Sequence, residues 1–187
     1  MKNIILISCL IFTTLSCKAQ IEPVQNQINY RNSDNGIPEG TYLKDVDNLF
    51  DPFIGTWTGT YNNNNYEFNV IETIKQTTNS SRDRLLISYK ITDAANNTII
   101  DTTILPDDSI YQLRGDMFLG NGRTYSLFYA GYESNCGQNG TVTIAVINNG
   151  TQMNLGLILT GDSDLDNCPS GVAEQVLPLD NMVLTKQ

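Results

Sequence analysis

Histidine is absent from the 187-residue chain, and tryptophan occurs once. Without histidine the most common general base is missing, and Ser–His or Cys–His nucleophile pairs cannot form. No Gly-x-Ser-x-Gly elbow and no phosphate-binding loop is present. Two carboxylates could still form a glycosidase pair, but nothing in the sequence selects two of the acids. The sequence therefore names no catalytic residue and favours a protein that is not an enzyme.

Basic residues are also scarce. The chain has 11 Lys and Arg against 20 Asp and Glu, which gives a formal net charge of −9. Because no basic stripe runs along the sequence, binding to nucleic acid is disfavoured, and so is attraction to anionic lipid. The negative charge is best explained by solubility, and it favours a neutral or cationic partner.

Cysteines are few, and their positions are informative. Cys9 and Cys17 lie near the N-terminus, which leaves Cys136 and Cys168. Two cysteines of an exported domain usually form a disulfide, which here would be worth ~3–4 kcal/mol in the chain-entropy model. Two cysteines without histidine do not make a zinc site. We expect a Cys136–Cys168 disulfide, no metal and no cofactor.

An acidic loop precedes the last cysteine. Asp162, Asp164 and Asp166 alternate as the first ligands of a calcium loop do. The positions that need Gly and Glu, however, hold Asn167 and Ala173. We expect a solvated acidic loop there.

The N-terminus predicts an exported precursor. Lys2 precedes the short apolar run Ile4–Phe12, which is typical of a signal peptide over residues 1–19. A stable transmembrane helix needs about 20 apolar residues, so the run is too short to be one. No other stretch of the chain is equally apolar.

Two processing sites compete at this junction. Ser16-Cys17 resembles the end of a bacterial lipobox, although Thr14 and Leu15 depart from its usual residues. The alternative is ordinary cleavage after Ala19. We favour lipidation of Cys17, which predicts an outer-membrane or cell-surface lipoprotein held to the membrane by its lipid anchor only. Cleavage after Ala19 predicts a periplasmic or secreted protein.

The remaining chain divides into a polar tether, residues 20–42, and one domain, residues 43–187. Apolar residues at helical spacing over Asp45–Phe53 predict a short helix, which Pro52 limits to one or two turns. Arg114-Gly115-Asp116 predicts a turn.

Strand signals dominate after this helix. Alternation of apolar and polar residues, and turns such as Asn148-Asn149-Gly150, predict about nine strands. They cover Thr56–Tyr61, Tyr66–Ile74, Arg84–Thr92, Thr98–Leu105, Asp116–Leu119, Arg123–Tyr132, Thr141–Ile147, Gln152–Thr160 and Met182–Lys186. No helical run of a dozen residues follows Trp57, which excludes βαβ units. The fold class is all-β, an antiparallel meander of about eight or nine strands that closes into a barrel; a β-sandwich is the alternative.

Phe53-Ile54-Gly55-Thr56-Trp57 resembles the opening of calycins, the group that contains lipocalins and fatty-acid-binding proteins. The resemblance implies that Trp57 plugs the closed end of the barrel and that Gly55 allows helix and strand to approach closely. It also implies that Lys186 of the last strand stands in for a basic side chain over the tryptophan. The Arg-x-Tyr of fatty-acid-binding proteins has no match in the last strand. Residues 38–187 also resemble a family of uncharacterised exported proteins of Bacteroidetes, which implies a calycin-like barrel but brings no activity.

These observations predict an envelope-anchored, non-enzymatic binding protein that holds a small apolar or amphipathic ligand in a calycin-like cavity. The alternative is an interaction or inhibitor module with a filled barrel, whose partner is another envelope protein. A carboxylate-dependent hydrolase is the third reading. A cavity of about 300 Å³ or more favours the first.

Overall fold

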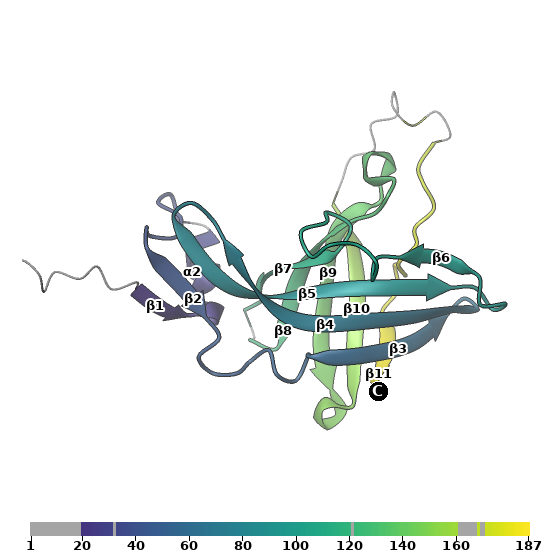
Figure 1. Ribbon diagram of the computed structural model, residues 1–187, viewed down its shortest axis with the longest axis horizontal. Helices are drawn as coiled ribbons and strands as arrows, with labels where there is room; N and C mark the ends of the chain where they lie inside the picture. Colours follow the sequence, from purple (N-terminus) through teal and green to yellow (C-terminus); the bar gives the residue numbers. More distant parts are fainter. Residues whose placement is uncertain (1–19, 32, 121, 161–167, 169–170) are drawn as a thin grey trace, which may run out of the picture.

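The computed structural model describes residues 20–31, 33–120, 122–160, 168 and 171–187. Within this part of the chain, eight strands close into an antiparallel barrel (Figure 1). In their order around the barrel they are β3 (Gly55–Tyr61), β4 (Asn64–Gln76), β5 (Ser80–Thr92), β7 (Leu113–Phe118), β8 (Thr124–Ala130), β9 (Asn139–Ile147), β10 (Gln152–Leu159) and β11 (Met182–Lys186).

Two pairings close the ring. β11 pairs with β3 through Lys186↔Trp57, and β5 pairs with β7 through Leu86↔Arg114. Because the first and last barrel strands are hydrogen-bonded, the barrel is confirmed and the β-sandwich is excluded. Each of the nine predicted strands has a counterpart, with β6 (Thr98–Asp101) lying on the edge of β5 outside the ring.

The predicted polar tether is wrong for most of its length. Its residues form β1 (Gln20–Pro23), the 3₁₀ helix η1 (Val24–Asn26) and the short helix α2 (Gln27–Arg31), and β2 (Thr41–Lys44) follows. β1 runs parallel to β2, and β2 runs parallel to the start of β5. The tether was expected to have no core, yet Val24 and Thr41 are buried.

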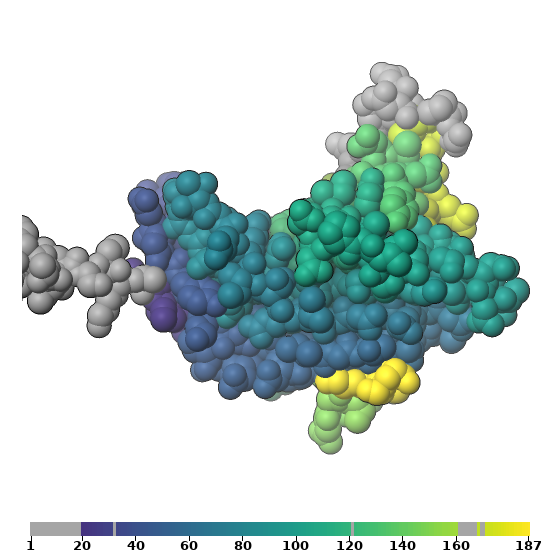
Figure 2. Space-filling view, in the orientation of Figure 1, coloured from purple at the N-terminus to yellow at the C-terminus, as the bar shows by residue number. Residues whose placement is uncertain are grey.

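This N-terminal lobe extends the barrel at one end. β4 and β5 are each 13 residues long, and their far ends project beyond the other barrel strands, where β2 pairs with the start of β5 and β1 pairs with β2 (Figure 1). In the space-filling view the lobe forms the purple-to-blue end of the molecule (Figure 2).

The helix predicted over Asp45–Phe53 does not form. The Asp45 carboxylate accepts backbone hydrogen bonds from Leu49 at 2.9 Å and Phe50 at 2.8 Å. Asn48 has a φ of 55°, which interrupts right-handed helical geometry. A side chain that binds nearby amides competes in this way with the helix. The apolar residues still face inward, since Phe50 and Phe53 are buried.

The barrel interior is filled by side chains. Leu85, Ile87, Tyr89 and Ile91 alternate along β5 and are all buried, as predicted. The rings of Phe50, Phe118 and Tyr125 lie 4.9–5.3 Å apart between centroids. Burying each such side chain contributes about 1.5–3 kcal/mol.

The predicted turn at Arg114-Gly115-Asp116 is also wrong, because these residues lie within β7. β7 passes very close to β5 at this point: a Cβ on Gly115 would lie 2.5 Å from the Leu85 carbonyl oxygen. The register to β8 shifts between Gly115 and Phe118. Glycine therefore serves a close approach of two strands here.

Candidate functional site

One end of the barrel is closed by Trp57, which has no exposed surface. Its indole Nε1 donates a 2.7 Å hydrogen bond to the Phe53 carbonyl oxygen. The Lys186 ammonium lies 5.1 Å from the centre of the Trp57 rings and donates to the Pro52 carbonyl at 3.2 Å. The β3–β11 pairing thus places a cation over the aromatic ring.

Gly55 has a φ of +127°, which disfavours any residue with a side chain. A Cβ on Gly55 would lie 3.2 Å from Cε of Lys186. The expected close approach is therefore to Lys186. Since no helix forms over Asp45–Phe53, the expected helix contact is wrong.

The opposite end of the barrel opens into a cleft of about 730 Å³. It lies between the β3–β4 hairpin, the edge made by β5 and β6, and the segments that precede β9 and β11 (Figure 1). The lining residues are Tyr61, Asn62, Asn64, Tyr66, Ile91, Ile99, Glu133, Gln138, Glu174, Gln175, Val176, Leu177, Pro178, Leu179 and Asp180.

The cleft is amphipathic and acidic. Tyr66, Ile91 and Leu177 are buried beneath it. Glu133, Glu174 and Asp180 line it as well, and no lysine or arginine is among the described residues that line it. Such a surface suits a ligand with an apolar part and a neutral or cationic polar part.

Tyrosine hydroxyls hold one wall of the cleft. Tyr61 donates a 2.9 Å hydrogen bond to the Asp180 carboxylate, and this bond raises the pKa of Tyr61. Tyr66 donates to the Val176 carbonyl at 3.3 Å. Both bonds connect the β3–β4 hairpin to the segment before β11, so this segment bridges the mouth of the barrel.

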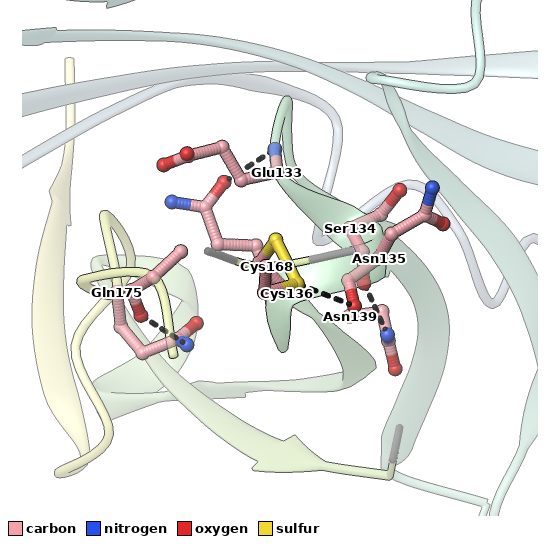
Figure 3. Close-up of a disulfide and its surroundings, with 9 residues drawn as sticks. Glu133, Ser134, Asn135, Cys136, Asn139, Cys168 and Gln175 are labelled. Carbon is pink, nitrogen blue, oxygen red and sulfur yellow. Dashed lines mark hydrogen bonds between the residues drawn. A yellow bond between two sulfur atoms is a disulfide. The ribbon is translucent and has the colours of Figure 1, made fainter. Parts of the chain in front are cut away.

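A disulfide anchors the other wall (Figure 3). Cys136 and Cys168 are bonded, with their Cα atoms 5.5 Å apart, which confirms the predicted pair. Cys136 ends the 3₁₀ helix η2 (Ser134–Cys136) between β8 and β9. The Ala173 amide donates to the Cys136 carbonyl at 2.8 Å, so the chain after Cys168 runs along the same wall.

Two amide side chains continue this attachment. Gln138 donates to the Glu174 carbonyl at 2.7 Å and accepts a 3.0 Å hydrogen bond from the Glu133 amide. Gln175 donates to the Gly137 carbonyl at 3.2 Å. The disulfide and these bonds together fix the distance between the two segments that carry the acidic residues of the cleft.

The sequence did not indicate most of the cleft residues. Only the cysteine pair and the aromatic strand positions could be identified from the sequence, because the cleft is formed by loops that meet in space.

The predicted lipidation site Cys17 and the aspartates 162, 164 and 166 lie outside the described residues. In the described part of the chain, no three His, Cys, Asp or Glu side chains come together as metal ligands would. None of the described helices is long and apolar enough to cross a membrane.

The fold and the cleft define a small closed antiparallel barrel, plugged at one end and open at the other. Residues 1–115 match the model of a family of unknown function, DUF6705, and the chain belongs to this family. The match ends within β7, so the strands from β8 onward and the segments that carry the acidic cleft residues lie beyond it. No curated protein and no solved structure matches the chain.

Proposed function

We propose that the protein binds a small amphipathic ligand, neutral or cationic, in the cleft at the open mouth of the barrel. The observation that carries this proposal is the cleft of about 730 Å³ itself, a volume within the range of about 300–1,000 Å³ that is typical of ligand sites. The ligand lies at the mouth, because aromatic side chains fill the barrel centre.

The calycin resemblance supports a binding role. Calycins bind ligands at the mouth of a barrel whose other end is plugged by tryptophan, and here Trp57 and Lys186 form such a plug. We propose that the barrel is calycin-like in this sense. Fold analogy alone does not establish function, so the cleft chemistry has to identify the ligand.

A neutral fluorescent probe, N-phenyl-1-naphthylamine, tests the cleft directly. Wild-type protein should enhance its fluorescence saturably. Ile99→Arg should abolish this signal, because Ile99 lines the cleft and is 44% exposed. Ile158→Arg is the matched control, since Ile158 is 61% exposed and does not line the cleft. Equal probe binding by both variants would exclude the mouth as the site.

Native mass spectrometry of protein from its own host then identifies the ligand. A co-purifying small molecule, absent from Ile99→Arg, is the expected result.

The second candidate function is an interaction module for another envelope protein, and the filled barrel interior favours it. A protein partner lost in Ile99→Arg, with no small molecule bound to wild type, would place that candidate first.

We further propose that the protein is exported and carries a lipid on Cys17. The support is the short apolar run before Ser16-Cys17 and the disulfide in the domain. Cells fed a clickable fatty acid should label the wild type and not Cys17→Ala. A wild-type protein that stays unlabelled and begins at Gln20 would show cleavage after Ala19 instead.

A further inference from the structure

Four basic side chains gather on one outer face of the sheet, away from the cleft. Register places Lys75 of β4 directly opposite Arg82 of β5. Arg84 follows two residues later on the same face, and Arg114 of β7 is paired with Leu86, the next residue of that face. These are four of the eleven basic residues of a chain with a net charge of −9. We call Lys75, Arg82, Arg84 and Arg114 the cationic face.

This face is on the outside of the barrel. The same row of β4 and β5 positions includes Ile71, which is paired with Leu86 and is 45% exposed. The four basic side chains are themselves partly exposed. In Figure 2 the surface dips between the N-terminal lobe and the lobe formed by the β6–β7 segment, and strands β4 and β5 run beneath this dip in Figure 1.

Three arginines of this face have a buried Nε–H donor with no acceptor among the described residues. The Nε atoms of Arg82, Arg84 and Arg114 are buried, and none has a hydrogen-bond partner among the described residues. Arg82 uses one terminal nitrogen on the Gly115 carbonyl, at 3.3 Å. Buried donors are nearly always satisfied in folded proteins, so three orphaned Nε–H groups on neighbouring strands indicate a missing acceptor.

Asp107 and Asp116 lie near enough to act on the face, but among the described residues no carboxylate forms a close ion pair with it. In the described part of the chain, none of its four side chains forms an ion pair within 4.0 Å, and the nearby Asp116 carboxylate is paired with Arg31 at 3.6 Å. Burial and the charges of Arg82, Arg84 and Arg114 lower the pKa of Lys75. Like charges on directly opposed strand positions destabilise a sheet, so the pairing of Lys75 with Arg82 opposes folding.

We propose that the cationic face is a binding site for a phosphate group. The planar guanidinium forks present paired N–H donors that fit tetrahedral oxyanions bidentately, and Lys75 adds a point charge. Four cations suit one or two phosphates. An extended polyanion would be repelled by the rest of the acidic surface. The phosphate has two sources with the same chemistry, free inorganic phosphate or the phosphomonoester of a lipid headgroup.

Calorimetric titration with inorganic phosphate, and co-sedimentation with phosphatidylcholine vesicles with and without phosphatidic acid, test both sources. Arg84→Gln/Arg114→Gln should weaken binding about tenfold or more, because it removes two charge-assisted contacts. Lys44→Gln/Lys90→Gln is the matched control; it removes two charges outside the face, and Lys90 is already paired with Asp101 at 3.3 Å. Phosphate binding identifies the free anion, and binding only to phosphatidic acid vesicles identifies a headgroup.

A wild-type protein that binds neither probe would overturn the proposal, and so would equal affinities in the two double variants. If the double arginine variant does not fold, Lys75→Gln provides the same comparison, since this lysine is partly exposed. Bound phosphate should also raise the thermal midpoint of wild type more than that of the variant at the same phosphate concentration. The cleft variant Ile99→Arg should bind phosphate normally, which separates this site from the proposed ligand cleft.

Discussion

At the scale of single residues, Trp57 and Lys186 determine how the barrel is closed. Trp57→Ala should lower the free energy of unfolding by ~3–5 kcal/mol, because it empties a packed site and leaves the Phe53 carbonyl without its donor. Lys186→Met keeps the chain length and removes the charge over the ring, so it should cost only about 0.5–1 kcal/mol. Urea unfolding measures both values.

Lys44→Met is the control for Lys186→Met, since Lys44 is exposed on β2. It should change stability by less than about 0.5 kcal/mol. If Lys186→Met costs less in a Trp57→Leu background, which has no aromatic ring, the two side chains are energetically coupled, as the 5.1 Å distance predicts. Additive losses in the double variant would contradict the cation–π contact.

At the scale of elements, the disulfide holds the segment that precedes β11 against the β8–β9 connection. Cys136→Ser/Cys168→Ser should lower the free energy of unfolding by ~3–4 kcal/mol. Amide exchange should rise first at Ala173, whose N–H donates to the Cys136 carbonyl. Hydrogen-exchange mass spectrometry measures this rise in exchange, and peptides of β3 serve as the internal control.

Because the segment that precedes β11 lines the cleft, the variant without the disulfide should also bind N-phenyl-1-naphthylamine more weakly. Unchanged exchange over 171–181 would show that the other hydrogen bonds hold this wall without the disulfide.

Alternation was sufficient to predict the strands of the barrel, because one face of each is buried and the other is exposed. It failed where polar side chains determine the backbone. Asp45 captures two amides and replaces a helix, and the polar segment after Gln20 gains its order by pairing β2 with β5. The cationic face was invisible in the sequence for a related reason: Lys75 and Arg114 come together only through the registers β4–β5 and β5–β7. The cleft depends on loop contacts, which no local pattern encodes.

At the scale of the whole molecule, buried tyrosines should limit stability in alkali. Burial and the Asp83 carboxylate raise the pKa of Tyr42 from 10.0 to about 12, and burial raises that of Tyr129 to about 12. Burial also raises the pKa of Tyr89 and Tyr125. Unfolded tyrosines release their protons near pH 10.0, so above that pH the folded state binds more protons than the unfolded state.

The stability that these groups contribute is therefore complete below pH 10 and is lost as the pH rises from 10 to about 12. Urea midpoints should be flat up to about pH 9 and then fall, in step with tyrosinate absorbance on unfolding. Tyr129→Phe should flatten this fall while changing the neutral midpoint little, because the Tyr129 hydroxyl has no partner among the described residues. Tyr61→Phe is the control: its hydroxyl is at the surface and bonded to Asp180, so its loss should leave most of the alkaline fall in place. Ionisation of all nine tyrosines near pH 10 in the folded protein, before any loss of structure, would contradict the burial of these hydroxyls.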